Sequence, residues 1–492
     1  MNRKMIRHTF RNKWVLITTG LFLFSSCNEF LDEDPDNRVA LDNLESAAQL
    51  LVSAYSLASP NFTDWMSDDV DFTTGTTIRL SHEQMFAWDD VTTGPTEFDT
   101  PDFFWFETYQ AISHANEVLN ILEDLPALSP EDIQRRRAIE SEALLTRAYG
   151  HFMLVNMFGG HIGREEAEDG VPYVKEPETT FLAQYERQSV SRVYDEIEDD
   201  LLRGLELVDD TFFENSGKYH FNRNAALAFA SRFYLFQRDY TRCLQYSNQL
   251  LGASPEAFVR DLTSEEFALA RSSTTEYPRL YTSPDQAANL LLMRKLSLVM
   301  RTDFAYGPNE NFYRQLFDEH PFGSLTDARE NPAFVKGFEG TYPARYENLF
   351  QRSSLNSNVG TPYYIHMAFT GEEVLLNRAE ANAFQNNLDA ALADLQVLSE
   401  RRFTGGTPEL TLANIQTFLG NNDPQDALLT YIILLERRKE FIMQGMRWWD
   451  LKRFGFGVQR TTGETLEGND PRKILQIPTS AIDVGGLEPN PR

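Results

Sequence analysis

Cysteine is scarce in this sequence: only Cys27 and Cys243 occur among its 492 residues. Histidine is also rare, with eight copies scattered along the chain, and His82-Glu83 lacks the second histidine that a zinc-binding H-E-x-x-H motif requires. A disulfide framework and a histidine-based zinc site are therefore both disfavoured. A chain of this length can bury most of its surface, so we expect core packing to stabilise it.

The signatures of common enzyme classes are missing as well. The sequence contains no G-x-S-x-G, no G-x-x-x-x-G-K and no C-x-x-C. Carboxylate pairs are so abundant that spacing along the chain cannot identify the two that a glycosidase needs. We therefore predict no catalytic residue, no metal ion and no cofactor, with a structural calcium ion as the alternative to the last two.

Basic residues are outnumbered: there are 45 Lys and Arg against 73 Asp and Glu, for a net charge of −28. Such an acidic surface repels phosphate backbones, which bind through clustered Lys and Arg. Nucleic acid is therefore excluded as a partner.

Long apolar runs are absent too, apart from a short one near the start. Five basic residues precede an apolar run from Trp14 to Phe24, and Ser25 and Ser26 follow it. This run of about eleven residues is too short for a transmembrane helix, which needs about 20, and the layout is typical of a secretory signal over residues 1–26. The Ser-Ser-Cys ending indicates lipidation of Cys27, with an ordinary secreted protein as the alternative. Removing residues 1–26 takes away five bases and no acid, which lowers the net charge to −33.

Residues 27–40 are acidic and contain a proline, which indicates an exposed, extended tether. An EF-hand is disfavoured because Asn37 and Asn43 stand where the loop starting at Asp32 needs Gly and Glu. Acidic clusters at Asp68-Asp69-Asp71 and Asp89-Asp90 leave calcium open as an alternative to simple solvation.

Helical periodicity dominates the rest of the chain. Leu144, Ala148, Phe152 and Val155 recur at steps of three or four. Residues 228–248 align without a gap with residues 376–396, and each segment predicts two helices joined by a short polar turn. This pattern is typical of tetratricopeptide-like hairpins. Cys243 aligns with an alanine, so we interpret it as a small packing residue.

Residues 426–455 predict a further long helix that Gly445 bends or ends, with Trp448 and Trp449 in the core. Residues 60–106 and 253–366 are instead rich in aromatic residues among polar ones, and long loops often carry function. A flat ring in such a loop can stack on a sugar face. The ligand-binding candidates from these regions are Trp65, Trp88, Tyr281, Tyr306 and Tyr346.

Four segments resemble the SusD/RagB family of outer-membrane lipoproteins, over nearly the whole chain. They are "CNEFLDEDP", the helix with Tyr109, Ile112, Ala115 and Asn116, the stretch "ERRKEFIMQGMRWWDLKRFG", and the ending with Ile477-Pro478 and Asn490-Pro491. The third is the most specific, although Gln444 stands where the family usually has Glu.

The resemblance implies a mainly α fold: four tetratricopeptide-like helix pairs form a scaffold, and a loop-rich irregular half carries the ligand face. It implies a position on the outer face of the outer membrane, held by lipid, and a SusC-like TonB-dependent transporter as partner. It also implies capture of glycans, or in some branches peptides, without bond cleavage. The family's ligand-contacting residues follow no fixed motif, so none is transferred.

We therefore expect five parts: the signal (1–26), the lipidated tether (27–40), an N-terminal helical region (41–252), a loop-rich aromatic region (253–366) and a C-terminal region with the signature (367–492). The leading hypothesis is a surface lipoprotein that captures oligosaccharides for import. The alternatives are an oligopeptide-binding member of the same family, a glycosidase on a helical scaffold, and an adaptor that binds only protein.

Overall fold

The computed structural model describes residues 41–73, 77–162, 169–180, 183–213, 217–302, 304–336, 340–460 and 463–492. The predicted signal, the tether and Cys27 lie outside the described residues. Within them, Asn43–Arg492 forms one compact unit. None of the helices in these ranges combines the length and the apolar character needed to cross a membrane.

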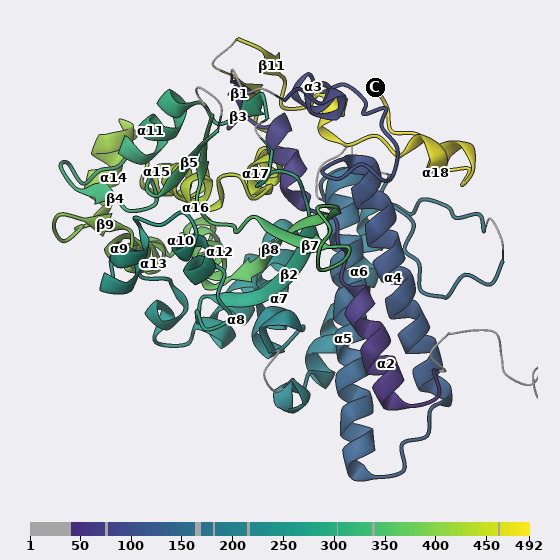
Figure 1. Cartoon of the computed structure of the whole chain (residues 1–492). Helices are drawn as coiled ribbons and strands as arrows, with labels where there is room; N and C mark the ends of the chain where they lie inside the picture. The colour runs from purple at the N-terminus through teal and green to yellow at the C-terminus, as the bar shows by residue number, and fades with distance from the viewer. Residues whose placement is uncertain are drawn as a thin grey trace, which may run out of the picture. The chain divides into compact units, whose positions relative to one another are not determined.

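Helices dominate the described residues, which confirms the mainly α fold class (Figure 1). The α-helices are α2 (Leu44–Leu51), α3 (Leu80–Phe86), α4 (Pro101–Asp124), α5 (Pro130–Phe158), α6 (Val190–Leu207), α7 (Arg223–Phe236), α8 (Tyr240–Leu251), α9 (Glu265–Ala270), α10 (Glu276–Tyr281), α11 (Glu310–Asp318), α12 (Gly371–Phe384), α13 (Leu388–Glu400), α14 (Leu412–Leu419), α15 (Pro424–Thr430), α16 (Arg437–Phe441), α17 (Met446–Phe454) and α18 (Thr479–Asp483). Side-chain oxygens cap many of them: Ser129 caps α5 in a capping box with Asp132.

The strands are mostly short and antiparallel. They are β1 (Asp71–Phe72), β2 (Asn289–Leu296), β3 (Tyr306–Gly307), β4 (Thr326–Asp327), β5 (Ala333–Lys336), β6 (Gly340–Pro343), β7 (Leu349–Arg352), β8 (Gly360–Thr370), β9 (Phe403–Thr404), β10 (Val458–Gln459) and β11 (Thr465–Leu466). One three-stranded sheet has the order β2-β8-β7, and the other strands form two-stranded pairs. The expectation of a loop-rich region over 253–366 missed this sheet.

The helices α2, α4, α5 and α6 pack side by side as a bundle, and the β2-β8-β7 sheet lies between them and the C-terminal helices (Figure 1). One core cluster extends through both parts, with Phe152 of α5, Phe236 of α7 and Trp449 of α17 in mutual ring contact. Trp448 and Trp449 are buried, as predicted.

The two aligned segments form equivalent hairpins, α7–α8 and α12–α13. Their turns use the same conformation, because Arg238 (φ 62°) and Asn386 (φ 60°) occupy aligned positions in the left-handed region. The next backbone N–H in each closes the turn, Asp239 to Tyr234 O at 2.9 Å and Asn387 to Asn382 O at 2.8 Å. The predicted helix pairs are therefore confirmed here, while their tetratricopeptide-like character stays a prediction.

Cys243 lies in the interface between these hairpins, fully buried, with its thiol 3.7 Å from Asn377 O of α12. Burial raises its pKa to about 12. The prediction of a small packing residue is confirmed, because a thiol with so high a pKa carries almost no reactive thiolate.

The predicted long helix over 426–455 is broken in two. A π-helical turn (Tyr431–Glu436) joins α15 to α16, and α17 starts after Gly445. Gly445 has φ 78°, and a Cβ there would lie 2.6 Å from Pro60 O. Its N–H donates to Asp64 Oδ2 at 2.8 Å, so glycine lets this turn press against residues 60–66.

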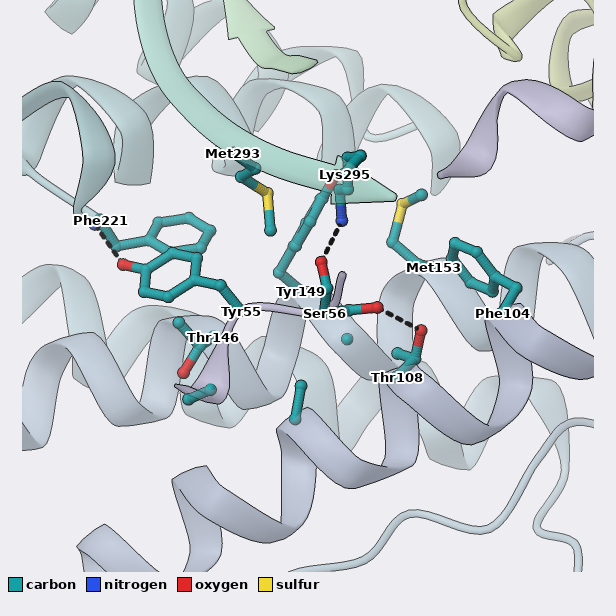
Figure 2. A pocket seen from close by; sticks show the side chains of 13 residues that line it. Tyr55, Ser56, Phe104, Thr108, Thr146, Tyr149, Met153, Phe221, Met293 and Lys295 are labelled. Carbon is teal, nitrogen blue, oxygen red and sulfur yellow. Dashed lines mark hydrogen bonds between the residues drawn. The ribbon is translucent and has the colours of Figure 1, made fainter. Parts of the chain in front are cut away.

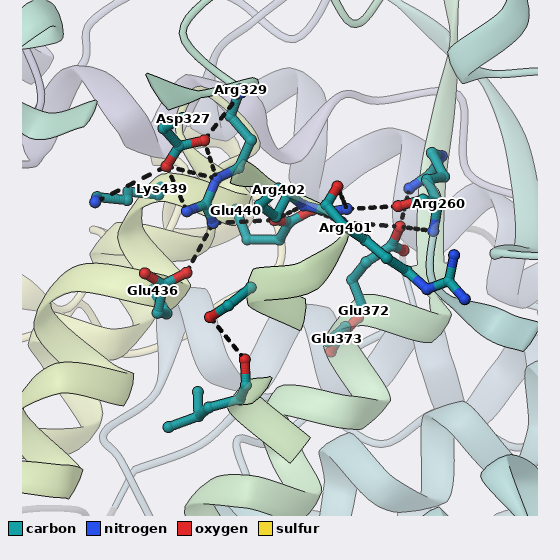
Figure 3. Close-up of polar contacts among 12 residues, drawn as sticks. Arg260, Asp327, Arg329, Glu372, Glu373, Arg401, Arg402, Glu436, Lys439 and Glu440 are labelled. Atoms are coloured by element: carbon teal, nitrogen blue, oxygen red, sulfur yellow. Dashed lines mark hydrogen bonds and ion pairs between the residues drawn. The ribbon is translucent and has the colours of Figure 1, made fainter. Parts of the chain in front are cut away.

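The charged residues of the signature stretch are buried and paired. Arg329 bonds both oxygens of Asp327 and also reaches Glu436 and Glu440 (Figure 3). Glu440 in turn accepts two bonds of 3.0 Å from Arg402. Figure 3 shows the chain of pairs continuing to Glu372 and Arg260. These ion pairs link four acids to three arginines, and Lys439 joins them through Asp327. Together they hold β4 and Arg260 against α12 and α16.

A second set of pairs ties the same stretch to α12. Arg437 and Arg453 share Asp450, with bonds of 3.0 and 2.8 Å, and Arg453 also pairs with Glu380. Burial opposes ionisation of Asp450, but the two guanidinium groups outweigh it and lower its pKa. The most specific family signature is therefore part of the buried scaffold.

Candidate functional site

The structure buries all five predicted ligand-binding rings. Trp65, Trp88, Tyr281, Tyr306 and Tyr346 are between 0% and 6% exposed. The loops that carry these rings fold back and use them to fill the core, and their contact with a ligand stays a prediction. They separate into two groups.

Trp65, Trp88 and Tyr306 lie in one group. Its rings and one guanidinium form a continuous stack: Phe72, 47% exposed, packs on Tyr306 at 5.4 Å, and Tyr306 packs on Phe86 at 4.7 Å. Arg460 lies between Phe86 (3.6 Å) and Trp88 (4.0 Å). The stack therefore extends from an exposed ring at one end to Trp88 at the other.

Trp65 holds two members of this stack, Tyr306 and Arg460, through hydrogen bonds. Its indole N–H donates to Tyr306 O at 3.3 Å, and its ring lies 3.7 Å from the imidazole of His82. Arg460 donates to Trp65 O at 3.0 Å. Trp65 is thus a structural residue of the stack.

Trp88 ends the stack at the wall of a cleft, which we call the Trp88 cleft, with a volume of about 110 Å³. Trp88 has φ 57°, and its indole N–H donates to Met66 O at 2.8 Å, which holds the ring in place. Two parts of the chain that are distant in sequence line this cleft. One wall consists of Met66, Met85, Trp88, Asp89, Asp90, Val91, Thr92, Pro101 and Asp102. The other, C-terminal wall consists of Arg472, Leu475, Gln476, Ile477, Pro478, Thr479 and Arg492.

Asn490 holds the C-terminal wall of the cleft. It donates to Phe158 O (2.8 Å) and Leu475 O (2.7 Å), and Gln476 Oε1 accepts its backbone N–H at 2.7 Å. Ile477-Pro478 and Asn490-Pro491, the ending that carried the family resemblance, thus shape this wall. The cleft-lining Gln476, Thr479, Arg472 and Arg492 were not predicted as site residues, although that ending marked their segment.

The cleft presents carboxylates and guanidinium groups together. Arg492 pairs with Asp90 at 2.6 Å, and Arg472 with Asp470 through two bonds of 2.8 and 2.9 Å. Asp102, in the first turn of α4, is 9% exposed, and burial raises its pKa to about 6. The cleft thus offers donors and acceptors beside one indole wall.

Two of the acids considered for calcium are neutralised by arginine. Asp68 accepts two bonds of 2.8 Å from Arg447, and Asp69 accepts one of 2.5 Å from Arg438. In the described part of the chain, no three His, Cys, Asp or Glu side chains gather as metal ligands would. Asp68 and Asp69 instead anchor residues 60–70 to the signature stretch.

Tyr281 and Tyr346 belong to the second group, a satellite core beside the charged pairs of Figure 3. Arg260 lies 4.2 Å above the Tyr281 ring, and Tyr346 packs on Tyr364 at 4.6 Å. The structure therefore does not bring these two residues to the Trp88 cleft, because they pack in a separate cluster.

A cavity beneath β2 is too small for a sugar. It measures about 20 Å³, and Figure 2 shows Lys295 reaching into it from the sheet. Lys295 donates to Ser56 O at 2.6 Å, and burial lowers its pKa to about 7. This volume suffices for a single water molecule.

Two family models match the chain. One, described as starch-binding and associating with the outer membrane, matches residues 29–235, and one described as the SusD family matches residues 356–481. No curated protein sequence matches the chain significantly.

Solved structures share the fold. A SusD superfamily protein from Bacteroides thetaiotaomicron is 20% identical, with a TM-score of 0.67 over 92% of this chain and 100% of that one. A SusD-like carbohydrate binding protein from Bacteroides vulgatus is 18% identical, with a TM-score of 0.61 over 90% and 97%. A laminarin binding SusD-like protein is 19% identical, with a TM-score of 0.64 over 92% and 99%.

The fold and these matches define a class, the mainly α-helical SusD-like proteins. Together the two family models cover both the N-terminal half and the signature stretch. The chain belongs to the SusD/RagB family.

Proposed function

We propose that this protein is a cell-surface lipoprotein that captures oligosaccharides at the Trp88 cleft and delivers them to a SusC-like TonB-dependent transporter. Family membership supports the general function. We place the site in the Trp88 cleft because this cleft combines an indole wall with carboxylates, guanidinium groups, an amide and hydroxyls. Sugar rings combine an apolar face with many hydroxyls, and this lining complements both.

Each group in the cleft has a distinct part in this proposal. The edge of Trp88 contacts the apolar face of a sugar ring, Thr92 exchanges hydrogen bonds with hydroxyls, and Gln476 donates to a hydroxyl the amide hydrogen that it does not give to Asn490 O. Asp89 and Asp102 accept hydrogen bonds from hydroxyl groups, and Arg472 donates hydrogen bonds to ring or hydroxyl oxygens. Only part of an oligosaccharide fits in about 110 Å³, so the rest extends along the surface.

Isothermal titration calorimetry of residues 28–492 against a panel of neutral oligosaccharides tests the proposal. We expect at least one ligand to bind, and Asp89→Asn with Asp102→Asn to weaken that binding about tenfold, the equivalent of about 1.4 kcal/mol. Asp389→Asn, an exposed acid on α13, is the matched control and should leave affinity unchanged. If peptides bind and no glycan does, the substrate class is wrong. If the paired variants bind like the control, the site is wrong.

A glycosidase is the second candidate, and one observation favours it. A carboxyl whose pKa burial raises to about 6, in a cleft lined by further carboxyl groups, has the properties of a general acid. Incubating the protein with its ligand and measuring new reducing ends decides between binding and cleavage. We expect no new reducing ends; cleavage that Asp102→Asn abolishes would make the protein an enzyme.

The lipid anchor and the transporter are tested in cells. We expect Cys27→Ser to leave the outer-membrane fraction when the proposed SusC-like transporter is deleted, because acyl chains supply the membrane affinity. We also expect the wild-type protein to co-purify with a large β-barrel protein. A Cys27→Ser variant that stays in the outer membrane without the transporter would refute the lipid tether.

A further inference from the structure

Residues 173–180 and 183–188, which precede α6, form a second and larger cleft together with Glu196 of α6, and we call it the Tyr185 cleft. Its volume is about 400 Å³, within the range of small-molecule binding sites. The lining residues are Tyr173, Val174, Lys175, Glu176, Pro177, Glu178, Thr179, Thr180, Ala183, Tyr185, Gln188 and Glu196. None of them was predicted as a site residue.

Two residues of the family-like helix motif hold the floor of this cleft. From α4, Tyr109 donates to Pro172 O at 2.9 Å, and Asn116 donates to Val174 O at 3.0 Å. These bonds run from a long helix to the backbone of the cleft segment. They give a loop the fixed position that a binding site requires.

A buried ion pair strengthens the floor from α5 and α6. Arg147 bonds both oxygens of Asp200, at 2.7 and 2.8 Å, and also donates to Lys175 O at 3.2 Å. Tyr173 donates to the same Asp200 at 2.5 Å, and its ring stacks on His151 at 3.8 Å. The floor is therefore preorganised by side chains from three helices.

The rim carries hydrogen-bond acceptors. Tyr185, half-buried, donates to Glu178 at 3.0 Å, which fixes both side chains. Glu196 pairs with Lys175 and Arg192, whereas Glu176 and Glu178 have no basic partner among the described residues.

Gln188 also lines the cleft, and its Oε1, which the protein covers, accepts no hydrogen bond in the described part of the chain.

We propose that the Tyr185 cleft is a second saccharide-binding site, which accepts neutral or amino sugars and rejects uronic acids. This inference rests on the proposed function for its ligand class. The Tyr185 ring supplies a face for a sugar ring, and Thr179 and Thr180 bond its hydroxyls. Glu176 and Glu178 accept from hydroxyls or from an ammonium group, and they repel a uronate carboxylate.

A cationic side chain of a partner protein is the competing occupant for the same acceptors. The volume of the cleft favours the saccharide, because a lysine or arginine tip fills only a small part of about 400 Å³. The hydroxyl and amide groups around the carboxylates likewise suit several ring hydroxyls better than one point charge.

Calorimetry with three trisaccharides tests the proposal: laminaritriose, the glucosamine trimer and trigalacturonic acid. The protein is residues 28–492, as wild type, as Tyr185→Ala with Glu178→Gln, and as Asp89→Asn with Asp102→Asn. The control is Glu206→Gln, an exposed acid at the end of α6. Melting temperatures of all variants check that each one folds.

We expect one of the first two sugars to bind and trigalacturonic acid not to bind. The Tyr185 and Glu178 changes should weaken this binding at least tenfold or remove one of two binding steps, while Glu206→Gln binds like wild type. Binding that depends only on Asp89 and Asp102 would overturn this inference and leave the proposed function standing. If none of the three trisaccharides binds, this inference is overturned. The proposed function is tested separately, by calorimetry with the wider panel of neutral oligosaccharides. A tight uronate complex would overturn the stated selectivity.

Discussion

Glu440 is the residue whose substitution most directly tests the buried charge scaffold. Its carboxylate accepts bonds of 3.0, 3.0 and 3.3 Å from Arg402 and Arg329, and both arginine side chains are fully buried. Glu440→Gln keeps the shape but removes the charge and points an amide N–H group toward guanidinium donors. Breaking a buried pair of this kind costs about 3–5 kcal/mol. Against a typical total of about 5–15 kcal/mol, that is a large share of the stability.

Urea unfolding at pH 7.5, followed by tryptophan fluorescence and circular dichroism, measures this loss. Glu310→Gln is the matched control, because Glu310 also accepts two bonds from one arginine, Arg314, at 2.8 and 3.0 Å, but on the surface. An exposed pair contributes about 0–1 kcal/mol, so the control should unfold almost like wild type. Equal losses in the two variants would refute the role of the buried network.

The same network predicts a pH dependence. Burial opposes ionisation of Glu440, but Arg402 and Arg329 outweigh it and lower its pKa below 4.5. A carboxylate whose pKa is lower in the folded state stabilises the fold above its unfolded pKa and loses that effect as the pH falls. The free energy of unfolding of wild type should therefore exceed that of Glu440→Gln by its full amount above about pH 5, and this difference should shrink toward pH 3. A difference that stays constant over this range would contradict the electrostatic explanation.

Three further predictions follow from burial. Trp65→Ala and Trp449→Ala should each lower the free energy of unfolding by about 3–5 kcal/mol in urea titrations, because both rings are buried. Near-normal stability of Trp65→Ala would contradict the burial of this ring. Asp102→Asn should raise the melting temperature most at pH 8, less at pH 5 and not at all below about pH 4, because burial raises the Asp102 pKa from 3.8 to about 6 and the cost of burying this acid disappears only when the unfolded state is protonated too; a pH-independent shift would contradict this. Cys243 should resist a thiol reagent in native buffer and react fully in urea, and fast native labelling would contradict its burial.

The sequence predicted the helices well because their signals are local. Apolar spacing and a gap-free internal alignment identified α7–α8 and α12–α13, down to the equivalent turn residues Arg238 and Asn386. Cys243, Trp448 and Trp449 were correctly placed in the core for the same reason. The β2-β8-β7 sheet was missed, since more than sixty residues separate β2 from its partner β8 and only β7–β8 are close enough in sequence to form a hairpin.

The candidate site was harder to predict. Trp88 was identified, but the C-terminal wall opposite it and the whole Tyr185 cleft were not. Composition shows that a segment is aromatic; it does not show whether a ring is covered. Tyr306 illustrates this, because strand pairing with Asp71–Phe72 and stacking on Phe86 bury it between segments far apart in the chain.

By itself, the sequence determined the mainly α fold, the internal repeat and the family, because these depend on local periodicity and on motifs of fixed spacing. Only the tertiary structure decided what the motifs do. The signature charges find partners at Asp68, Arg329, Glu380 and Arg402, tens to hundreds of residues away, and these pairs turn a family signature into a buried scaffold. Burial and ion pairing depend on which segments meet, and that is settled only when the chain packs.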